Sequence, residues 1–128
     1  MTPLPKTDSL RILVVEDEVI IAMDIAMQLR ELGHQPIGHA TRGEQAIALA
    51  QEHRPDLVLM DVHLGSAMDG ITCAAAIRTQ SGAEIVFLSA FDTSDNRARA
   101  QAVGPLGYIT KPFDTAELGS VIALTVGV

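Results

Sequence analysis

The chain has 128 residues, the length of a single domain, and its core must be aliphatic because hydrophobic residues make up 48% of it and aromatic residues only 3%. Its 16 acidic and 9 basic residues give a net charge of −7, which argues against direct nucleic-acid binding by this chain. The single cysteine, Cys73, excludes an internal disulfide, and no Cys/His spacing indicates a zinc site. The sequence shows neither a membrane-spanning apolar run nor a signal-peptide core. We therefore expect a cytoplasmic protein without membrane contact.

The first elements are a lead-in, a strand and a helix. Residues 1–9 contain two prolines and polar side chains, which predicts a disordered lead-in to a domain at residues 10–128. The apolar run 10–15 is short enough for a buried strand. Apolar positions at helical spacing then predict a helix over 18–32 that Gly33 ends.

The next segment predicts a second strand, a second helix and a third strand. A weak strand is expected at 35–39, followed by a helix at 43–53 that stops before Pro55. The strand at 56–62 has the clearest pattern, because it is almost entirely apolar. A loop with glycine at both ends is expected at 65–70.

The remaining elements are expected as helix, strand, helix, strand and helix, at 71–79, 84–89, 94–103, 107–110 and 115–125. Asp92 or Ser94 is expected to cap the helix that ends at Val103. The apolar residues of the last helix are expected mostly in the core, with a partner surface as the alternative. Strict alternation with short loops predicts a parallel sheet covered by helices on both faces.

Polar residues stand at the ends of several predicted strands. Glu16 and Asp17 follow the first strand, Asp61 lies near the end of the third, Ser89 closes the fourth and Lys111 follows the fifth. In open α/β sheets, ligands bind beyond the carboxyl ends of the strands. The sequence therefore predicts one cleft that gathers three carboxylates, a hydroxyl group and an ammonium group.

The three acids indicate a divalent cation. Three negative charges in a small volume are unfavourable unless a cation or a proton relieves them, and Mg²⁺ prefers a few carboxylates with several waters. An equally good interpretation of Glu16 and Asp17 alone is that they cap the helix beginning near Val19, since acids favour helix N-termini. A structural role for Asp61 is less expected, because it has no turn to initiate immediately and no basic neighbour in the sequence.

Lys111 and Ser89 are weaker signals when taken singly. A Lys-Pro pair after a strand is usually only a turn, although a cis bond between Lys111 and Pro112 would aim the lysine back across the rim. The hydroxyl of Ser89 can donate to a phosphoryl oxygen or simply to the backbone. Together, the five positions favour a carboxylate that accepts a phosphoryl group beside a bound cation.

The chain resembles the receiver domain of two-component response regulators from about Leu10 to Leu124. The segments that carry the resemblance are ILVVEDE, PDLVLMDVHL, MDGI, IVFLSA and GYITKPF, in the same order and spacing. The resemblance implies a flavodoxin-like α/β fold, a doubly wound parallel sheet of five strands in the order 2-1-3-4-5.

The resemblance also implies a role for each matching residue. Asp61 would accept the phosphoryl group, and the Mg²⁺ ligands would be Glu16, Asp17, Asp61 and the backbone carbonyl of His63. Ser89 and Lys111 would bind the phosphoryl oxygens. Tyr108 would turn inward as a conformational switch when Ser89 moves toward the phosphoryl group.

Such a domain accepts its phosphoryl group from a sensor histidine kinase or a phosphotransfer protein. It is not a conventional enzyme, because it phosphorylates itself with Mg²⁺ and then loses the phosphoryl group slowly. Phosphorylation is expected to change the surface formed by the helix 94–103, the strand of Tyr108 and the last helix. That surface would control a partner or the association of the chain with itself, including a homodimer, and the chain is either a stand-alone regulator or part of a larger protein.

Two other functions are consistent with parts of the sequence. A small phosphohydrolase would use Asp61 as its nucleophile, but the following loop offers His63 where turnover calls for a second carboxylate. A nucleotide or flavin binder would share the sheet topology, but no Gly-rich phosphate loop follows the first strand.

Overall fold

The computed structural model describes residues 9–64, 68–90 and 94–124. Residues 1–8 of the predicted lead-in lie outside the described residues, as does Asp92, one of the two predicted helix caps. Ser9 is exposed and Leu10 is buried.

Within the described residues, five strands alternate with five helices. In chain order they are β1 (Arg11–Val15), α1 (Val19–Glu31), β2 (Gln35–Ala40), α2 (Gly43–His53), β3 (Leu57–Asp61), α3 (Gly70–Ser81), β4 (Glu84–Ser89), α4 (Ser94–Val103), β5 (Gly107–Thr110) and α5 (Thr115–Ala123). Each corresponds to a predicted element, and the bounds differ by no more than a residue or two at most ends. The predicted alternation is therefore confirmed.

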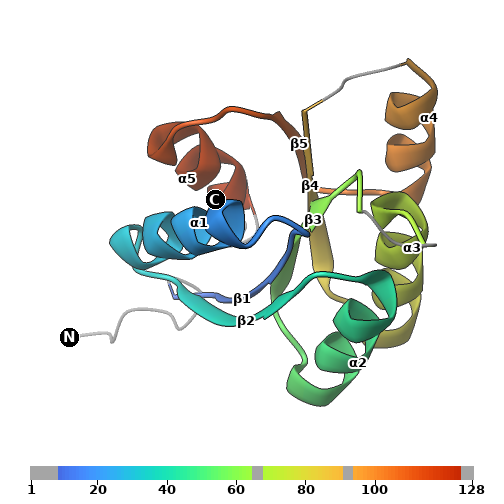
Figure 1. Ribbon diagram of the computed structural model, residues 1–128, viewed down its shortest axis with the longest axis horizontal. Coiled ribbons are helices and arrows are strands. Elements are labelled where there is room, and N and C mark those ends of the chain that lie inside the picture. The colour runs from blue at the N-terminus through green and yellow to red at the C-terminus, as the bar shows by residue number, and fades with distance from the viewer. Residues whose placement is uncertain (1–8, 65–67, 91–93, 125–128) are drawn as a thin grey trace.

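The strands form one parallel sheet in the order β2-β1-β3-β4-β5. Figure 1 shows the sheet between two layers of helices, with α1 and α5 on one face and α2, α3 and α4 on the other. This is the doubly wound, flavodoxin-like order that the resemblance implied. The strand order reverses between β1 and β3, and a cleft is expected beyond the carboxyl ends of these two strands.

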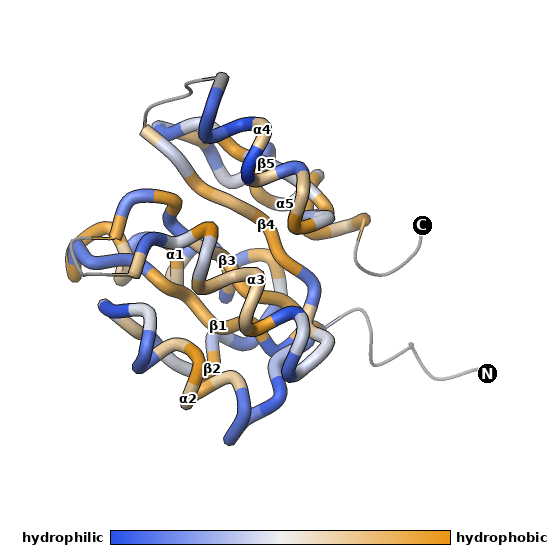
Figure 2. Tube along the Cα trace, turned by 90° about the vertical axis from the view of Figure 1, so that its right-hand side faces the viewer, coloured by the Kyte–Doolittle hydropathy of each residue, from blue (hydrophilic) through white to orange (hydrophobic). Residues whose placement is uncertain are grey.

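The core has two halves, one on each face of the sheet. Successive side chains of a strand point to opposite faces. Along β1, Leu13 and Val15 therefore belong to the cluster under α2 and α3, whereas Ile12 and Val14 belong to the cluster under α1 and α5. The strand β3 is buried along its whole length, which explains its unbroken apolar sequence, and Figure 2 shows the central strands mainly in the colours of hydrophobic residues.

The last helix contributes mainly to the core, as the sequence predicted for its apolar residues. Leu118 and Ile122 are fully buried against the sheet. Leu124 is instead 53% exposed at the end of the described chain, and Val126 lies outside the described residues. A capping box in which Asp114 and Glu117 bond to each other's backbone N–H groups starts this helix.

Candidate functional site

Three carboxylates meet beyond the ends of β1 and β3. Val15, the last residue of β1, lies opposite Met60 of β3, so the residues that follow on each strand are brought side by side. One carboxylate oxygen each from Glu16, Asp17 and Asp61 lies within 4.8 Å of the others. Glu16 and Asp61 are buried, and Asp17 is exposed at the mouth of the cleft.

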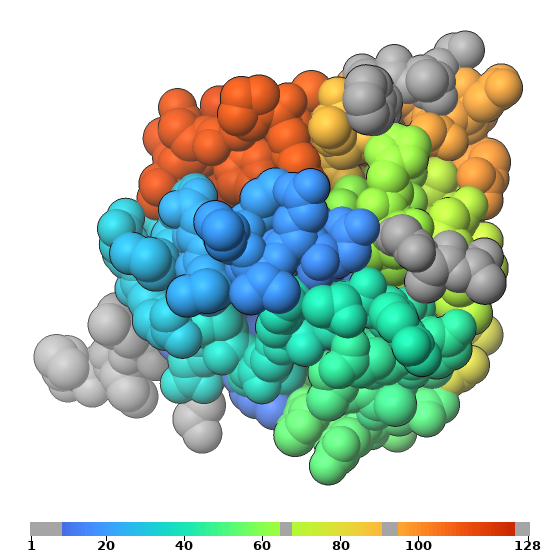
Figure 3. All heavy atoms as spheres, viewed as in Figure 1, coloured from blue at the N-terminus to red at the C-terminus, as the bar shows by residue number. Residues whose placement is uncertain are grey.

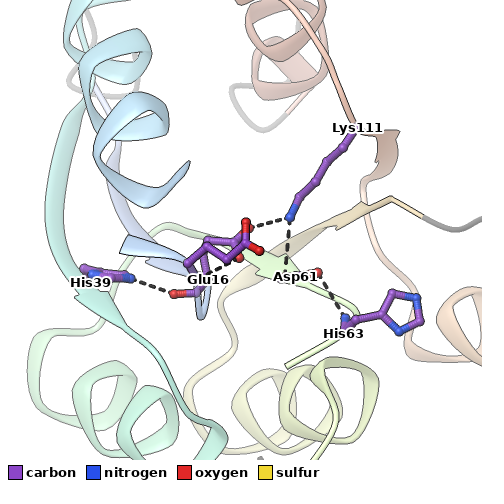
Figure 4. A network of polar contacts seen from close by, with 6 residues as sticks. Glu16, His39, Asp61, His63 and Lys111 are labelled. Atoms are coloured by element: carbon purple, nitrogen blue, oxygen red, sulfur yellow. Dashed lines mark hydrogen bonds and ion pairs between the residues drawn. The ribbon is translucent and has the colours of Figure 1, made fainter. Parts of the chain in front are cut away.

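Lys111 completes this cluster from the end of β5. Its Nζ donates a hydrogen bond to Oε1 of Glu16 and lies 3.4 Å from Oδ2 of Asp61. Figure 4 shows the lysine reaching across the cleft toward both carboxylates. The backbone N–H of Lys111 donates to the carbonyl of Ser89 at 2.8 Å, and the Lys111–Pro112 peptide bond is cis, the form that the sequence left open.

The carboxylates hold Lys111 in its charged form. Burial alone would lower the pKa of Lys111, because it disfavours the ammonium ion. The hydrogen bond to Glu16 and the negative charges of Asp61 and Glu16 outweigh this effect, so the pKa is raised above its ordinary value. The cleft therefore contains three carboxylates and one ammonium group, an excess of negative charge that suits a bound cation.

Glu16 has a second role at the start of α1. Its Oε2 accepts a hydrogen bond of 3.2 Å from the backbone N–H of Glu18, the N-cap residue, whose own side chain makes no cap bond. One carboxylate oxygen of Glu16 therefore binds the backbone at the start of α1, and the other binds Lys111 in the cleft. Both interpretations of Glu16 apply.

The backbone of Glu16 is fixed from the neighbouring strand. The imidazole Nε2 of His39 donates to the carbonyl of Glu16 at 2.7 Å, and the N–H of Glu16 donates to the carbonyl of Ala40 at 3.0 Å. His39 was not among the site residues predicted from the sequence. The signal in the sequence was its position near the end of the second predicted strand. In the sheet this strand pairs with the first strand, which Glu16 and Asp17 follow.

Asp61 also contributes to the local backbone structure. Its Oδ1 accepts a hydrogen bond of 3.0 Å from the N–H of His63, which folds the chain into a turn directly after β3. The expectation that Asp61 initiates no turn is therefore wrong. Its basic neighbour, Lys111, is distant in the sequence but adjacent in space, so the second carboxylate oxygen remains directed at the cleft.

The start of α3 lies close to the end of β3. The N–H of Gly70 donates to the carbonyl of Val62 at 3.0 Å, and a Cβ atom on Gly70 would lie only 1.8 Å from the carbonyl oxygen of Asp61. Asp69 caps α3 by accepting a hydrogen bond of 2.8 Å from the N–H of Thr72. Glycine is therefore required here for space, since no side chain fits against the backbone of Asp61.

Ser89 and Tyr108 lie on the strands beside Asp61. Leu88 is the partner of Asp61 across the β3–β4 ladder, so Ser89 stands one residue beyond it and is completely buried. Tyr108 is half-buried on β5, with its ring centroid 6.3 Å from that of Phe87. The roles assigned to Asp61, Lys111, Ser89, Tyr108 and the carbonyl of His63 remain predictions.

The ligand atoms of the cleft fit a hard divalent cation. The cluster offers carboxylate oxygens, the donors that Mg²⁺ prefers, and Asp17 is exposed at its mouth. None of the helices in the described part of the chain is long and apolar enough to cross a membrane.

Known proteins are similar to this chain in sequence and in fold. A family model described as the response regulator receiver domain matches residues 12–123. The transcriptional regulatory protein PdtaR of Mycobacterium tuberculosis is 43% identical over 116 residues, which cover 91% of this chain and 56% of that protein. The phyllosphere-induced regulator PhyR of Methylorubrum extorquens is 31% identical over 113 residues, which cover 88% of this chain and 42% of that protein.

A solved structure gives the same result. The signal receiver domain of a modulated diguanylate cyclase from Desulfovibrio desulfuricans G20 superimposes with a TM-score of 0.89 and 32% sequence identity, covering 94% of this chain and 95% of that one. The chain spans only about half the length of the two regulators above. With the family model spanning nearly all of its sheet and helices, this chain belongs to the response regulator receiver domains of two-component signalling.

Proposed function

We propose that this domain accepts a phosphoryl group on Asp61 from a phosphohistidine of a sensor histidine kinase or a phosphotransfer protein. The observation that carries the proposal is the position of the Asp61 carboxylate, buried in an acidic cluster and 3.4 Å from the ammonium nitrogen of Lys111. A carboxylate so placed combines a nucleophile with the positive charge that an incoming anion needs.

The acidic cluster would hold Mg²⁺ through Glu16, Asp17, Asp61 and the backbone carbonyl of His63. When bound, the cation supplies charge neutralisation between the attacking carboxylate and the phosphoryl group. Lys111 contributes the same kind of neutralisation beside Asp61, and its raised pKa keeps it charged near neutral pH.

The phosphoryl transfer needs no reactant besides the donor and Asp61. A carboxylate oxygen of Asp61 forms a bond to phosphorus while the phosphorus–nitrogen bond of phosphohistidine breaks. The electron pair of that bond stays on the imidazole nitrogen. The other ring nitrogen of the donor carries a proton, so the donor leaves as neutral histidine. The transition state of such a transfer is loose, so positioning and charge account for most of the rate.

The phosphorylated form would rearrange the residues at the ends of β4 and β5. Aspartyl phosphate adds negative charge and new hydrogen-bond acceptors at Asp61. The hydroxyl of Ser89 and the ammonium of Lys111 would bind those oxygens, and Tyr108 would follow as the switch residue. The changed surface of α4, β5 and α5 would then bind a partner or promote self-association. We also propose that the chain acts in the cytoplasm.

The surface beside the cleft favours a protein as the donor. The side chains of Val19, Ile20, Met23 and Met27 along α1 are more than half exposed. Next to them, a hollow of about 620 Å³ is lined by residues including Ile20, Lys111 and Phe113, so it joins α1 to the cleft. Figure 3 shows that α1 lies open at the surface beside α5. Exposed apolar area of this kind marks a protein-binding site and is not expected for a hydrolase of small phosphate esters.

The proposal is tested by incubating the chain with acetyl phosphate and measuring the mass of the intact protein. We expect a mass increase of one phosphoryl group that requires Mg²⁺ and disappears in Asp61→Asn. The matched control is Asp56→Asn, which changes the acid immediately before β3 instead of the acid that ends it. Sustained release of phosphate from diverse esters would instead favour the phosphohydrolase.

A further inference from the structure

The helix α4 is attached to the domain with little apolar contact. Of its residues 95–103, whose burial the structure describes, only Ala100 is buried. By contrast, α1 and α5 bury Ile25, Leu29, Leu118 and Ile122. Figure 2 shows α4 mostly in the colours of hydrophilic residues. Hydrophobic burial is the main source of helix anchoring. In α4 it comes from Ala100 and the partly buried Val103, so polar contacts have a larger share in holding this helix.

Hollows flank α4 on both sides. One of about 310 Å³ separates it from β5 and is lined by residues including Arg97, Ala100 and Tyr108. Another of about 350 Å³ lies toward α3, between residues including Arg78 and Val103. Both hollows are open to the surface, so α4 contacts its neighbours over only part of its length.

The first specific contact of α4 is with the switch tyrosine. The guanidinium carbon of Arg97 lies 4.4 Å from the ring centroid of Tyr108, within the range of a cation–π interaction. The hydroxyl of Tyr108 is buried and has no hydrogen-bond partner within the described part of the chain. The contact with Arg97 is therefore one of the contacts that the ring of Tyr108 makes with its neighbours, together with that to Phe87.

The second contact joins α4 to the loop after the proposed phosphoacceptor. The Nη2 atom of Arg99 lies 2.8 Å from Oδ2 of Asp69. Oδ1 of the same carboxylate caps α3. The pKa of Asp69 is lowered, because the hydrogen bonds from Thr72 and Arg99 outweigh the effect of burial. Asp69 is therefore charged and links the start of α3 to α4.

We propose that Arg97 and Arg99 form a two-point latch that holds α4 against the domain, one point on Tyr108 and the other on Asp69. The latch is a property of the unmodified chain, and its use as a signalling element rests on the proposed function. Both contacts are weak and partly exposed, so losing either one is expected to raise the local opening of α4 by roughly two- to fivefold. A helix held in this way shifts in response to small changes at the cleft or at β5.

Hydrogen–deuterium exchange of the unphosphorylated chain tests the latch. In Arg97→Met and in Arg99→Gln, we expect the amides of α4 to exchange about two- to fivefold faster, with α1 and α2 unchanged. The matched control is Arg42→Gln, which removes an exposed arginine 3.6 Å from Glu44 on α2. Arg97→Lys keeps the cation and should restore most of the protection. Unchanged exchange of α4 in both variants would overturn the proposal.

Asp69→Asn separates the ion pair from the helix cap. Asparagine caps a helix about as well as aspartate, so this variant should keep α3 intact and accelerate exchange in α4 as much as Arg99→Gln does. The double variant should exchange no faster than either single variant, because both remove the same contact. Additive effects would show that Arg99 and Asp69 act separately, contrary to the latch.

The chain offers a direct optical probe of the first contact. Tyr108 is the only tyrosine and there is no tryptophan, so intrinsic tyrosine fluorescence reports on this ring alone. We expect Arg97→Met to change the emission of the unmodified chain and Arg42→Gln to leave it unchanged. Beryllofluoride with Mg²⁺, a mimic of the phosphoryl group, should change the wild-type emission and accelerate exchange in α4. If the substitutions act and beryllofluoride does not, the latch stands and the proposed function fails.

Discussion

The ammonium nitrogen of Lys111 lies 3.4 Å from Oδ2 of Asp61 and donates a hydrogen bond to Glu16. The side chains of Glu16 and Asp61 are 0% and 6% exposed, so this one cation balances two buried carboxylates. The same arrangement stabilises the folded chain and provides positive charge for an incoming anion. Changes to Lys111 and to Asp61 are therefore expected to affect stability in opposite directions.

Lys111→Met is expected to destabilise the chain in the absence of Mg²⁺. Removing the cation leaves two buried carboxylates without a counter-charge, a loss of about 2–4 kcal/mol in the free energy of unfolding. Saturating Mg²⁺ should restore part of this loss, because it binds the folded state. Urea denaturation with and without Mg²⁺ measures both effects. An unchanged free energy of unfolding would show that the lysine does not balance the acids.

The contribution of Lys111 to stability is also expected to depend on pH. Its pKa is raised in the folded chain, so the folded state retains the proton more strongly than the unfolded state does. The contribution is therefore fully present below the ordinary lysine pKa of about 10.4 and is lost as the pH rises through the folded value. The difference in unfolding free energy between wild type and Lys111→Met should stay constant from pH 7 to pH 9 and shrink only at more alkaline pH.

Asp61→Asn is expected to stabilise the chain in the absence of Mg²⁺. The substitution removes one of three neighbouring negative charges, while the asparagine oxygen can still accept the hydrogen bond from the N–H of His63. We expect the free energy of unfolding to rise by roughly 0.5–2 kcal/mol, the range typical of single stabilising substitutions. The stabilisation by Mg²⁺ should fall in the same variant, and thermal unfolding measures both quantities. A loss of stability with unchanged Mg²⁺ response would contradict this account.

Gly70→Ala is expected to disrupt the site through its backbone. The added Cβ would lie 1.8 Å from the carbonyl oxygen of Asp61, and the chain cannot relieve this contact without moving β3 or the start of α3. We expect a loss of about 2–4 kcal/mol or failure to fold. The matched control is Gly38→Ala on β2, where the added Cβ would meet a side-chain carbon of Leu13 at an ordinary 3.6 Å. Equal stabilities of the two variants would refute the steric argument.

His34 is expected to weaken the fold at acidic pH. Its Nδ1 accepts a hydrogen bond of 3.0 Å from the N–H of Leu10, and burial lowers its pKa. The unfolded chain therefore binds a proton at this histidine more readily, and stability falls as the pH drops below the ordinary value of about 6.5 and through the lowered folded value. His34→Asn keeps an acceptor without a titrating group. Its free energy of unfolding relative to wild type should rise between pH 7 and pH 5, and a constant difference would contradict the assignment.

The sequence predicted the order of elements because the strands are short apolar runs separated by helical patterns. It also predicted that Asp61 would meet Glu16 and Asp17, since parallel strands bring their carboxyl ends to one edge. These inferences depend on chain direction and hydrophobic pattern alone. For that reason they did not need the positions of individual atoms.

The missed contacts depend on side chains from elements far apart in the sequence. His39 reaches the carbonyl of Glu16 only because β2 lies beside β1. The turn bond from His63 to Asp61 depends on the path of the loop, and the contacts of Arg97 and Arg99 depend on how α4 is placed. No local pattern specifies these geometries.

The most direct test of the account is to identify the residue that carries the phosphoryl group. The chain is incubated with Mg²⁺ and a phosphohistidine-bearing donor and is then treated with borohydride, which reduces an aspartyl phosphate to homoserine. Tandem mass spectrometry locates that homoserine. We expect the homoserine at position 61, and only when donor and Mg²⁺ are both present. Homoserine at another aspartate, or none despite an active donor, would contradict the assignment of Asp61 as the phosphoacceptor.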